Sequence, residues 1–86
     1  MYEILYEKKI LKDLDKIPAS DVARIVASVR ELSVNPAPRG AKKLSGQLTL
    51  YRIRQGDYRV VYTVDKREKM IRIVLIRHRG KAYRRV

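Results

Sequence analysis

Three arginines in the second half of the chain are spaced so that they could bind an anion together. In the segment 49–55, strand alternation puts Arg52 and Arg54 on the face opposite the apolar side chains. The segment 58–64 places Arg59 in the same way. Guanidinium groups on one sheet face repel one another, and they match the paired oxygens of a phosphate. The pattern predicts either a phosphate-binding face or a solvated outer face that is rich in arginine.

The distribution of charge favours phosphate binding. The 86 residues carry 21 Lys and Arg against 9 Asp and Glu, a formal net charge of +12. Residues 1–40 hold seven bases and six acids (+1), whereas residues 41–86 hold fourteen bases and three acids (+11). This asymmetry predicts attraction of nucleic acid or of an acidic protein, rather than charge kept only for solubility. The basic half lacks the pattern of an amphipathic helix, which argues against a membrane surface.

Composition excludes several kinds of chemistry. The chain has no cysteine, and His78 is its single histidine, so we expect no zinc site, no disulfide, no thiol nucleophile and no cofactor. The length predicts one domain over residues 1–86. The first twelve residues mix acids and bases, and no apolar run approaches the ~20 residues that span a bilayer. We therefore expect a cytoplasmic protein with no membrane partner.

The first half of the chain predicts one strand and two helices. Residues 2–6 are rich in strand formers, and residues 8–17 carry apolar side chains at helical spacing. Pro18 ends that helix, and Ser20 is placed to cap a second one, whose apolar stripe runs as far as Leu32. The short connection predicts an antiparallel helical hairpin that packs on a sheet.

The second half predicts a loop followed by three strands. Residues 35–40 form a loop by composition, and 41–46 continue it with basic residues. A tight turn at 56–57 and a charged turn at 65–69 then separate three strands: 49–55, 58–64 and 70–76. The last strand is apolar on nearly both faces, which is typical of the interior of a sheet. The fold class is α+β: an N-terminal strand, a helical hairpin on one face and a three-stranded antiparallel meander, giving a four-stranded sheet whose tyrosines fill the core.

Specific motifs resemble a known family. The stretches LYRIRQGDYRVVY (50–62) and IRIVLIRHR (71–79), followed by Tyr83, are similar to the RelE/ParE superfamily of toxins from type II toxin–antitoxin pairs. The resemblance spans nearly the whole chain. It implies a RelE-like, microbial-RNase-like fold, which agrees with the elements predicted from the pattern.

The resemblance also implies an activity. RelE-type toxins are ribosome-dependent endoribonucleases that cut mRNA in the ribosomal A site, where the ribose 2′-OH attacks the adjacent phosphate. Arg52 and Arg54 match the positions of two catalytic lysines, and Arg59 matches an arginine that holds the scissile phosphate. Arg79 matches a further arginine, and Tyr83 a tyrosine that stacks on or orients the substrate.

The arginines at the two lysine positions leave the proton acceptor open, because arginine stays protonated in proteins. His78 has the best chemistry for a general base, although strand parity sets it on the face of Ile76, away from Arg77 and Arg79. A structural or substrate-binding role for His78 is the alternative. The remaining candidates for contacts with mRNA or rRNA are Lys42, Lys43, Arg77 and Lys81, and plain solvated charge is the alternative for them.

Two other functions fit the same residues. The first is that of a ParE-like inhibitor of DNA gyrase without nuclease activity, and the second is that of a non-catalytic basic RNA-binding module. The resemblance implies a small acidic antitoxin as partner, besides the ribosome and mRNA. It implies promoter DNA only for the complex with the antitoxin, since the chain has no helix-turn-helix of its own.

Overall fold

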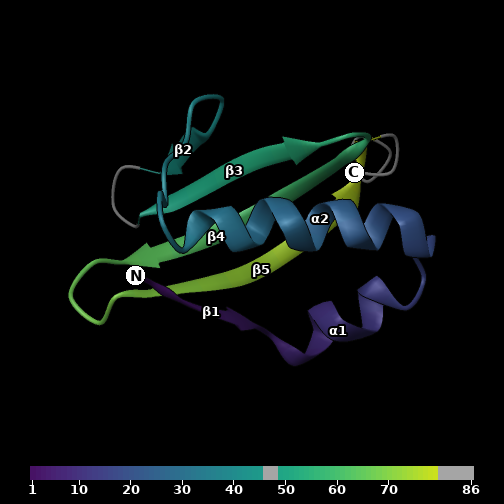
Figure 1. The fold of residues 1–86 in the computed structure, drawn as a ribbon, viewed down its shortest axis with the longest axis horizontal. Coiled ribbons are helices and arrows are strands. Elements are labelled where there is room, and N and C mark those ends of the chain that lie inside the picture. The colour runs from purple at the N-terminus through teal and green to yellow at the C-terminus, as the bar shows by residue number, and fades with distance from the viewer. Residues whose placement is uncertain (46–48, 80–86) are drawn as a thin grey trace.

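A computed structural model describes residues 1–45 and 49–79. Its elements are β1 (Glu3–Tyr6), α1 (Lys8–Leu14), α2 (Ala19–Leu32), β2 (Lys42–Ser45), β3 (Leu50–Gln55), β4 (Tyr58–Asp65) and β5 (Met70–His78). The strands form one sheet in the order β1-β5-β4-β3-β2, with the two helices beside it (Figure 1). The predicted α+β class is confirmed. No helix in the described ranges has the length and apolar character needed to cross a membrane.

The sheet has five strands instead of the predicted four, because β2 forms in the segment 41–46 that composition assigns to a loop. Lys42 and Lys43 pair with Arg52 and Tyr51 at the edge of β3. The first three residues of β2 are exposed, so they show no apolar alternation that would reveal a strand. Lysines are common on such edges, where they discourage pairing with other chains.

β5 lies inside the sheet, parallel to β1 and antiparallel to β4, as its apolar sequence predicts. A register shift opposite Val61 and Tyr62 leaves Val74 as an extra residue in the strand. Ile73 and Ile76 are three residues apart, yet both are buried in the core. The extra residue at the bulge changes which residues of β5 point toward the helices, so the apolar run is continuous. Only one face of the strand is fully buried.

The two helices differ in their ends from the prediction. α1 stops at Leu14, before the predicted end. The predicted Ser20 cap is wrong, because α2 already begins at Ala19 with Pro18 in the N-cap position. The Pro18 carbonyl accepts a hydrogen bond from the N–H of Asp21 at 2.9 Å. The helix starts early because the fixed φ of proline is compatible with a position at the helix entrance, and Ser20 falls inside the first turn.

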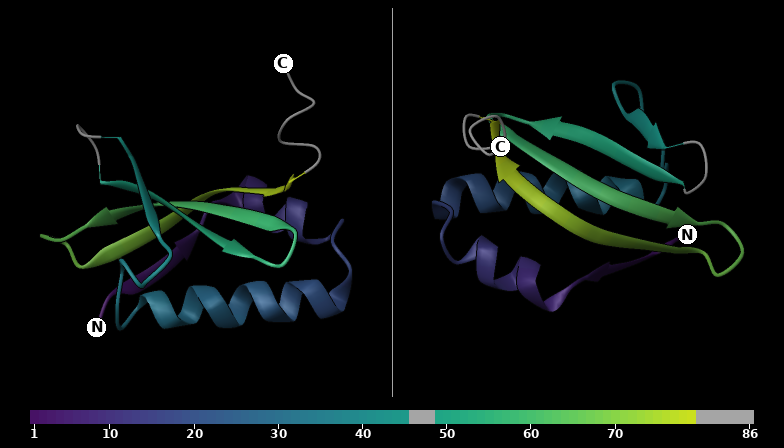
Figure 2. Two further views of the ribbon diagram at one scale, coloured as in Figure 1. Left: turned by 90° about the horizontal axis from the view of Figure 1, so that it is seen from above. Right: turned by 180° about the vertical axis from the view of Figure 1, so that it is seen from behind.

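The core lies between the helices and one face of the sheet. α2 runs along that face, and the opposite face carries no helix from the described residues (Figure 2). α2 buries Ile25, Val29 and Leu32 along one stripe, as predicted. The other fully or largely buried side chains are Ile10, Ile53, Val60, Tyr62, Val64, Ile71, Ile73 and Ile76.

Tyrosines complete the core, as predicted from their strand positions. Tyr62 is fully buried, and its hydroxyl donates a hydrogen bond to the Pro36 carbonyl at 2.7 Å. Its ring stacks on Tyr51 with a centroid separation of 5.8 Å. Burial, assisted by Tyr51, raises the pKa of Tyr62 to about 12. The partly buried tyrosines that pack around this centre are Tyr2, Tyr6, Tyr51 and Tyr58.

Candidate functional site

The open face of the sheet brings arginines from three strands into one row. Arg54 of β3 pairs with Arg59 of β4, and Arg59 pairs with Arg77 of β5. Residues that lie opposite one another in antiparallel strands project to the same side. The next residues along, Ile53 and Val60, are buried on the helix side, so this row points away from the helices. The side-chain directions predicted from alternation are confirmed at these positions.

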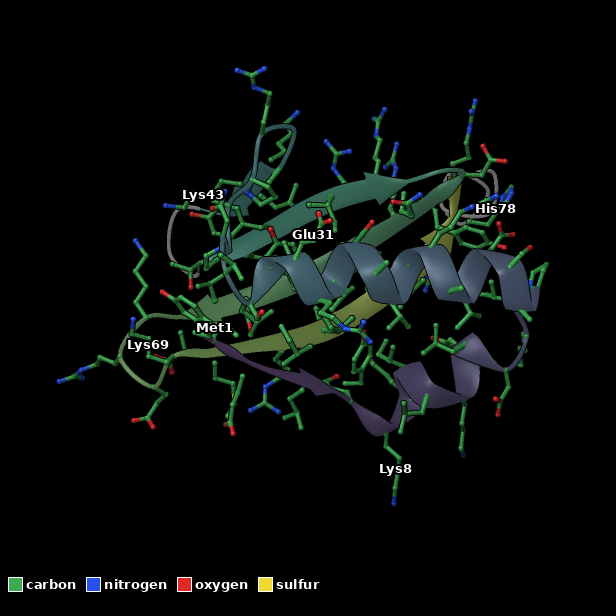
Figure 3. The ribbon with its side chains drawn as sticks, in the orientation of Figure 1. Met1, Lys8, Glu31, Lys43, Lys69 and His78 are labelled. Carbon is green, nitrogen blue, oxygen red and sulfur yellow. The ribbon has the colours of Figure 1, made fainter. Side chains whose placement is uncertain are left out.

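A second row extends the cationic face toward the sheet edge. Lys42 of β2 pairs with Arg52, and Arg52 pairs with Val61. Lys42 therefore stands beside the arginines, which the sequence alone could not place. Lys43 pairs with Tyr51 and belongs to the other face. Figure 3 shows Lys43 near one end of the sheet and His78 near the opposite end.

Electrostatics identify Arg59 as the centre of the group. Desolvation lowers the pKa of Arg59, and the nearby positive charges of Arg54, Arg52 and Arg79 lower it further. Its Nε atom is shielded from solvent. We call Arg52, Arg54, Arg59 and Arg79 the arginine cluster. Like charges gathered this closely disfavour one another, and a bound phosphate would relieve that repulsion.

Arg79 joins the cluster through the turn between β3 and β4. Gly56 has a φ of 60°, which suits the first central position of a two-residue type II′ hairpin loop. Asp57 follows it and holds Arg79 at two points: its carbonyl accepts the Arg79 backbone N–H at 2.7 Å, and its Oδ1 lies 3.8 Å from Arg79 Nη1. A hollow of about 190 Å³ is lined there by Arg54, Gly56, Asp57, Tyr58, Arg59 and Arg79.

Asp57 is a site residue that sequence reasoning treats only as a turn former. It is the one carboxylate among the residues that line this hollow in the described part of the chain. The sequence signal was its place directly before the Tyr58–Arg59 pair in a hairpin turn, but its contact with Arg79 spans 22 positions. Such a contact follows from the closing of the β4–β5 ladder and not from local pattern.

His78 lies on the helix side of the sheet. It pairs with Tyr58, and the two rings meet edge to face with centroids 5.3 Å apart and an interplanar angle of 86°. This position agrees with the strand parity that sets His78 apart from Arg77. The other two predicted site residues, Lys81 and Tyr83, lie outside the described residues. The cluster can thus bind and stabilise negative charge on phosphate oxygens, but its four guanidinium groups do not serve as proton acceptors at neutral pH.

Comparison with known proteins gives consistent matches over almost the full chain. The family model described as ParE toxin of the type II toxin–antitoxin system, parDE, matches residues 4–83. The chain is 32% identical over 84 residues to toxin RelE of Mycobacterium tuberculosis, covering 96% of this chain and 87% of that protein. It is 33% identical over 85 residues to toxin RelE3 of Methanocaldococcus jannaschii, covering 94% of each.

Solved structures give the same result. The toxin in the crystal structure of the archaeal RelE–RelB complex from Pyrococcus horikoshii superimposes with a TM-score of 0.83 at 35% identity, covering 93% of this chain and 97% of that chain. The isolated RelE toxin of E. coli superimposes with a TM-score of 0.79 at 20% identity, covering 91% of this chain and 84% of that chain, which shows the shared fold alone.

Proposed function

Because the chain belongs to the RelE/ParE superfamily of toxins from type II toxin–antitoxin systems, we propose that it is a ribosome-dependent mRNA endoribonuclease. It would act in the cytoplasm as a single RelE-like domain over residues 1–86, cut messages in the ribosomal A site and so stop translation. The observation that carries the proposal is the convergence of four guanidinium groups on the open sheet face around Arg59. That arrangement suits a scissile phosphate with negative charge on several oxygens.

In the proposed reaction, the ribose 2′-hydroxyl loses its proton and its oxygen bonds to the adjacent phosphorus. The bond from phosphorus to the 5′ oxygen then breaks, and that oxygen takes up a proton. The products are a 2′,3′-cyclic phosphate and a 5′-hydroxyl end. Arg59, Arg52 and Arg54 would bind the phosphoryl oxygens, where their fixed positive charge stabilises the transition state more than the ground state. Arg79 would add a further donor, and Tyr83 would stack on or orient the substrate.

The cluster supplies charge and not proton transfer, so the proton of the 2′-hydroxyl leaves to a group other than these arginines. The helix-side position of His78 favours a role in substrate binding or structure over that of general base. Arg77 and Lys42 would extend the contact surface for the phosphate backbone, because they project to the same face as the cluster. Lys43 and Lys81 are further proposed contacts with mRNA or rRNA.

A partner follows from the same family membership. The relatives from Pyrococcus horikoshii and Methanococcus jannaschii crystallised as complexes of RelE with the antitoxin RelB. We propose that this chain likewise binds a small acidic antitoxin that neutralises the basic face. Promoter DNA would be bound only by that complex.

Two observations favour an alternative function, that of a ParE-like inhibitor of DNA gyrase. The matching family model carries the ParE name, and arginine stands at both positions where the best-studied RelE-type member has catalytic lysines. A ParE-like inhibitor of DNA gyrase would use the scaffold without cutting RNA.

Mapping of mRNA ends after expression of the chain distinguishes these functions. The proposal predicts cuts inside the reading frames of translated messages, and their loss in Arg59→Ala. A matched control is Arg67→Ala, which removes the same charge from the exposed β4–β5 turn. DNA damage with intact messages would establish the gyrase function instead. Unimpaired growth with uncut messages would leave a non-catalytic RNA-binding module.

A further inference from the structure

A second hollow lies on the helix side of the same end of the sheet, between α1 and the ends of β4 and β5. Its volume is about 550 Å³, within the range of sites that bind small ligands. Lys9 and Asp13 of α1 and Lys16, two residues beyond its end, line the hollow together with Tyr58 of β4 and His78 of β5. We call it the α1–β5 hollow.

The lining combines aromatic rings with positive charge. Tyr58 and His78 are half-buried, and their rings meet edge to face. Lys9 and Lys16 are exposed, and each carries a flexible ammonium group that can approach a phosphate. Asp13 is the single acidic residue among the residues that line the hollow. Aromatic surface for a base and ammonium groups for a phosphate are the two contacts that proteins use for an unstacked nucleotide.

A strand edge adds a means of reading the base. β1 pairs with β5 only as far as Ile73, and the segment 75–77 beyond it lines the hollow. No strand among the described residues covers this side of that segment. The N–H and C=O groups of an uncovered strand edge stand in fixed directions and can hydrogen-bond to the edge of a base.

The α1–β5 hollow adjoins the arginine cluster. Tyr58 lines both this hollow and the smaller one that holds Arg54, Arg59 and Arg79. Arg77 also lines the α1–β5 hollow and is the cross-strand partner of Arg59. The two hollows therefore meet at Tyr58, with the arginine cluster on the open face and the α1–β5 hollow on the helix side. An RNA strand that turns round this end of the sheet would pass from one to the other.

We propose that the α1–β5 hollow is a nucleotide subsite, which takes one unstacked RNA nucleotide next to the phosphate held by the arginine cluster. This proposal rests on the proposed ribonuclease function, because it assigns the ligand as part of an RNA substrate. It gives His78 a place in base stacking, and it makes the hollow a determinant of which nucleotide lies beside the cut.

The test is NMR titration of the purified full chain with each of the four ribonucleoside 5′-monophosphates at constant ionic strength of about 0.15 M. Ribose 5-phosphate and inorganic phosphate are the comparison ligands. We expect the nucleotides to shift the signals of Tyr58, His78 and α1, and to bind more tightly than ribose 5-phosphate. The double variant Lys9→Ala, Lys16→Ala should weaken binding about fivefold to tenfold. The matched control Lys8→Ala, Lys12→Ala, whose side chains do not line the hollow, should change it less than about twofold.

The subsite would be overturned by nucleotide shifts confined to the arginine cluster, by equal weakening in the two double variants, or by equal affinity for nucleotides and inorganic phosphate. Shifts at the hollow produced by an acidic peptide and by no nucleotide would also overturn it and assign the surface to a protein partner. The readout needs no cleavage. Nucleotide binding in a chain that cuts no mRNA would support the subsite and refute the proposed nuclease, whereas cleavage without binding in the hollow would do the reverse.

Discussion

The two faces of the sheet are built from alternate residues of the same strands and meet opposite requirements. On the helix side, Val60 and Tyr62 are fully buried. On the open side, Arg59 lies among other guanidinium groups that disfavour its charge. One face stabilises the fold by removing apolar surface from water, and the other accepts a cost in stability to hold positive charge in place. Because side chains alternate along a strand, neighbouring residues serve these two roles. Substitutions on the helix side should therefore change stability, and substitutions on the open side should change activity.

Removal of the largest buried side chain should have the greatest effect on stability. Tyr62→Ala should lower the free energy of unfolding by about 3–5 kcal/mol, because it empties the space beneath α2. Equilibrium unfolding in urea measures this loss. In a chain of this size, such a loss can abolish folding, so Tyr62→Phe serves as the milder variant. Loss of its hydrogen bond to the Pro36 carbonyl should cost about 1 kcal/mol. Unchanged unfolding of Tyr62→Ala would contradict the assignment of the core.

The matching change on the open face should spare the fold and impair the reaction. Arg54→Ala removes the cross-strand partner of Arg59, so cleavage of ribosome-bound mRNA should slow by about 10²-fold. The same change should leave stability unchanged or raise it by about 0.2–1 kcal/mol, since it relieves repulsion between like charges. Cleavage rates and urea unfolding of one preparation give both values. A strongly destabilised Arg54→Ala would show that the two faces are not separable in this way.

The pH dependence of stability should reflect the burial of Tyr62 on the helix side of the sheet. Tyr62 is neutral in the folded state, and its pKa is raised to about 12 from an ordinary value of 10.0. The raised pKa stabilises the fold fully below pH 10, and this stabilisation is lost as pH rises from about 10 to about 12 at roughly 1.4 kcal/mol per pH unit. The total loss is about 2–3 kcal/mol. Urea unfolding across this range should show a shallower decline for Tyr62→Phe, and parallel curves for the two proteins would refute the assignment.

The smallest effect concerns the turn between β3 and β4. Asp57→Ala removes the carboxylate beside Arg79 but leaves the backbone hydrogen bond between the two residues. Because both side chains are largely exposed, their ion pair is worth about 0.2–1 kcal/mol, and cleavage should fall by no more than about fivefold. A double-mutant cycle with Arg79→Ala distinguishes positioning from a general structural role. If Asp57 acts through Arg79, its removal has no further effect in the Arg79→Ala chain, whereas additive losses would refute the link.

The sequence pattern predicts which side of the sheet most strand side chains face. The directions of Arg52, Arg54 and Arg59 and the buried tyrosines follow from residues two apart, and the structure agrees with both. The bulge at Val74 depends on how β4 and β5 match in register, which neither strand shows by itself.

The missed features share a physical reason. β2 has no apolar face, the start of α2 depends on Pro18 and not on a polar cap, and the contact of Asp57 with Arg79 needs the completed ladder. Each of these features depends on residues distant in the sequence or on backbone geometry. Neither can be seen in the pattern of polar and apolar side chains. The proposed roles of the arginines rest on a family resemblance, because alternation alone also fits a solvated face.

The most direct test of the central claim, that the arginine cluster stabilises a phosphate while its ester bond breaks, is the single-turnover cleavage rate of ribosome-bound mRNA by Arg59→Ala. We expect a rate about 10²–10³-fold below that of the unaltered chain, with the free energy of unfolding in urea unchanged or slightly raised and Arg67→Ala cleaving normally. A correctly folded Arg59→Ala protein that cuts at the unaltered rate would contradict it.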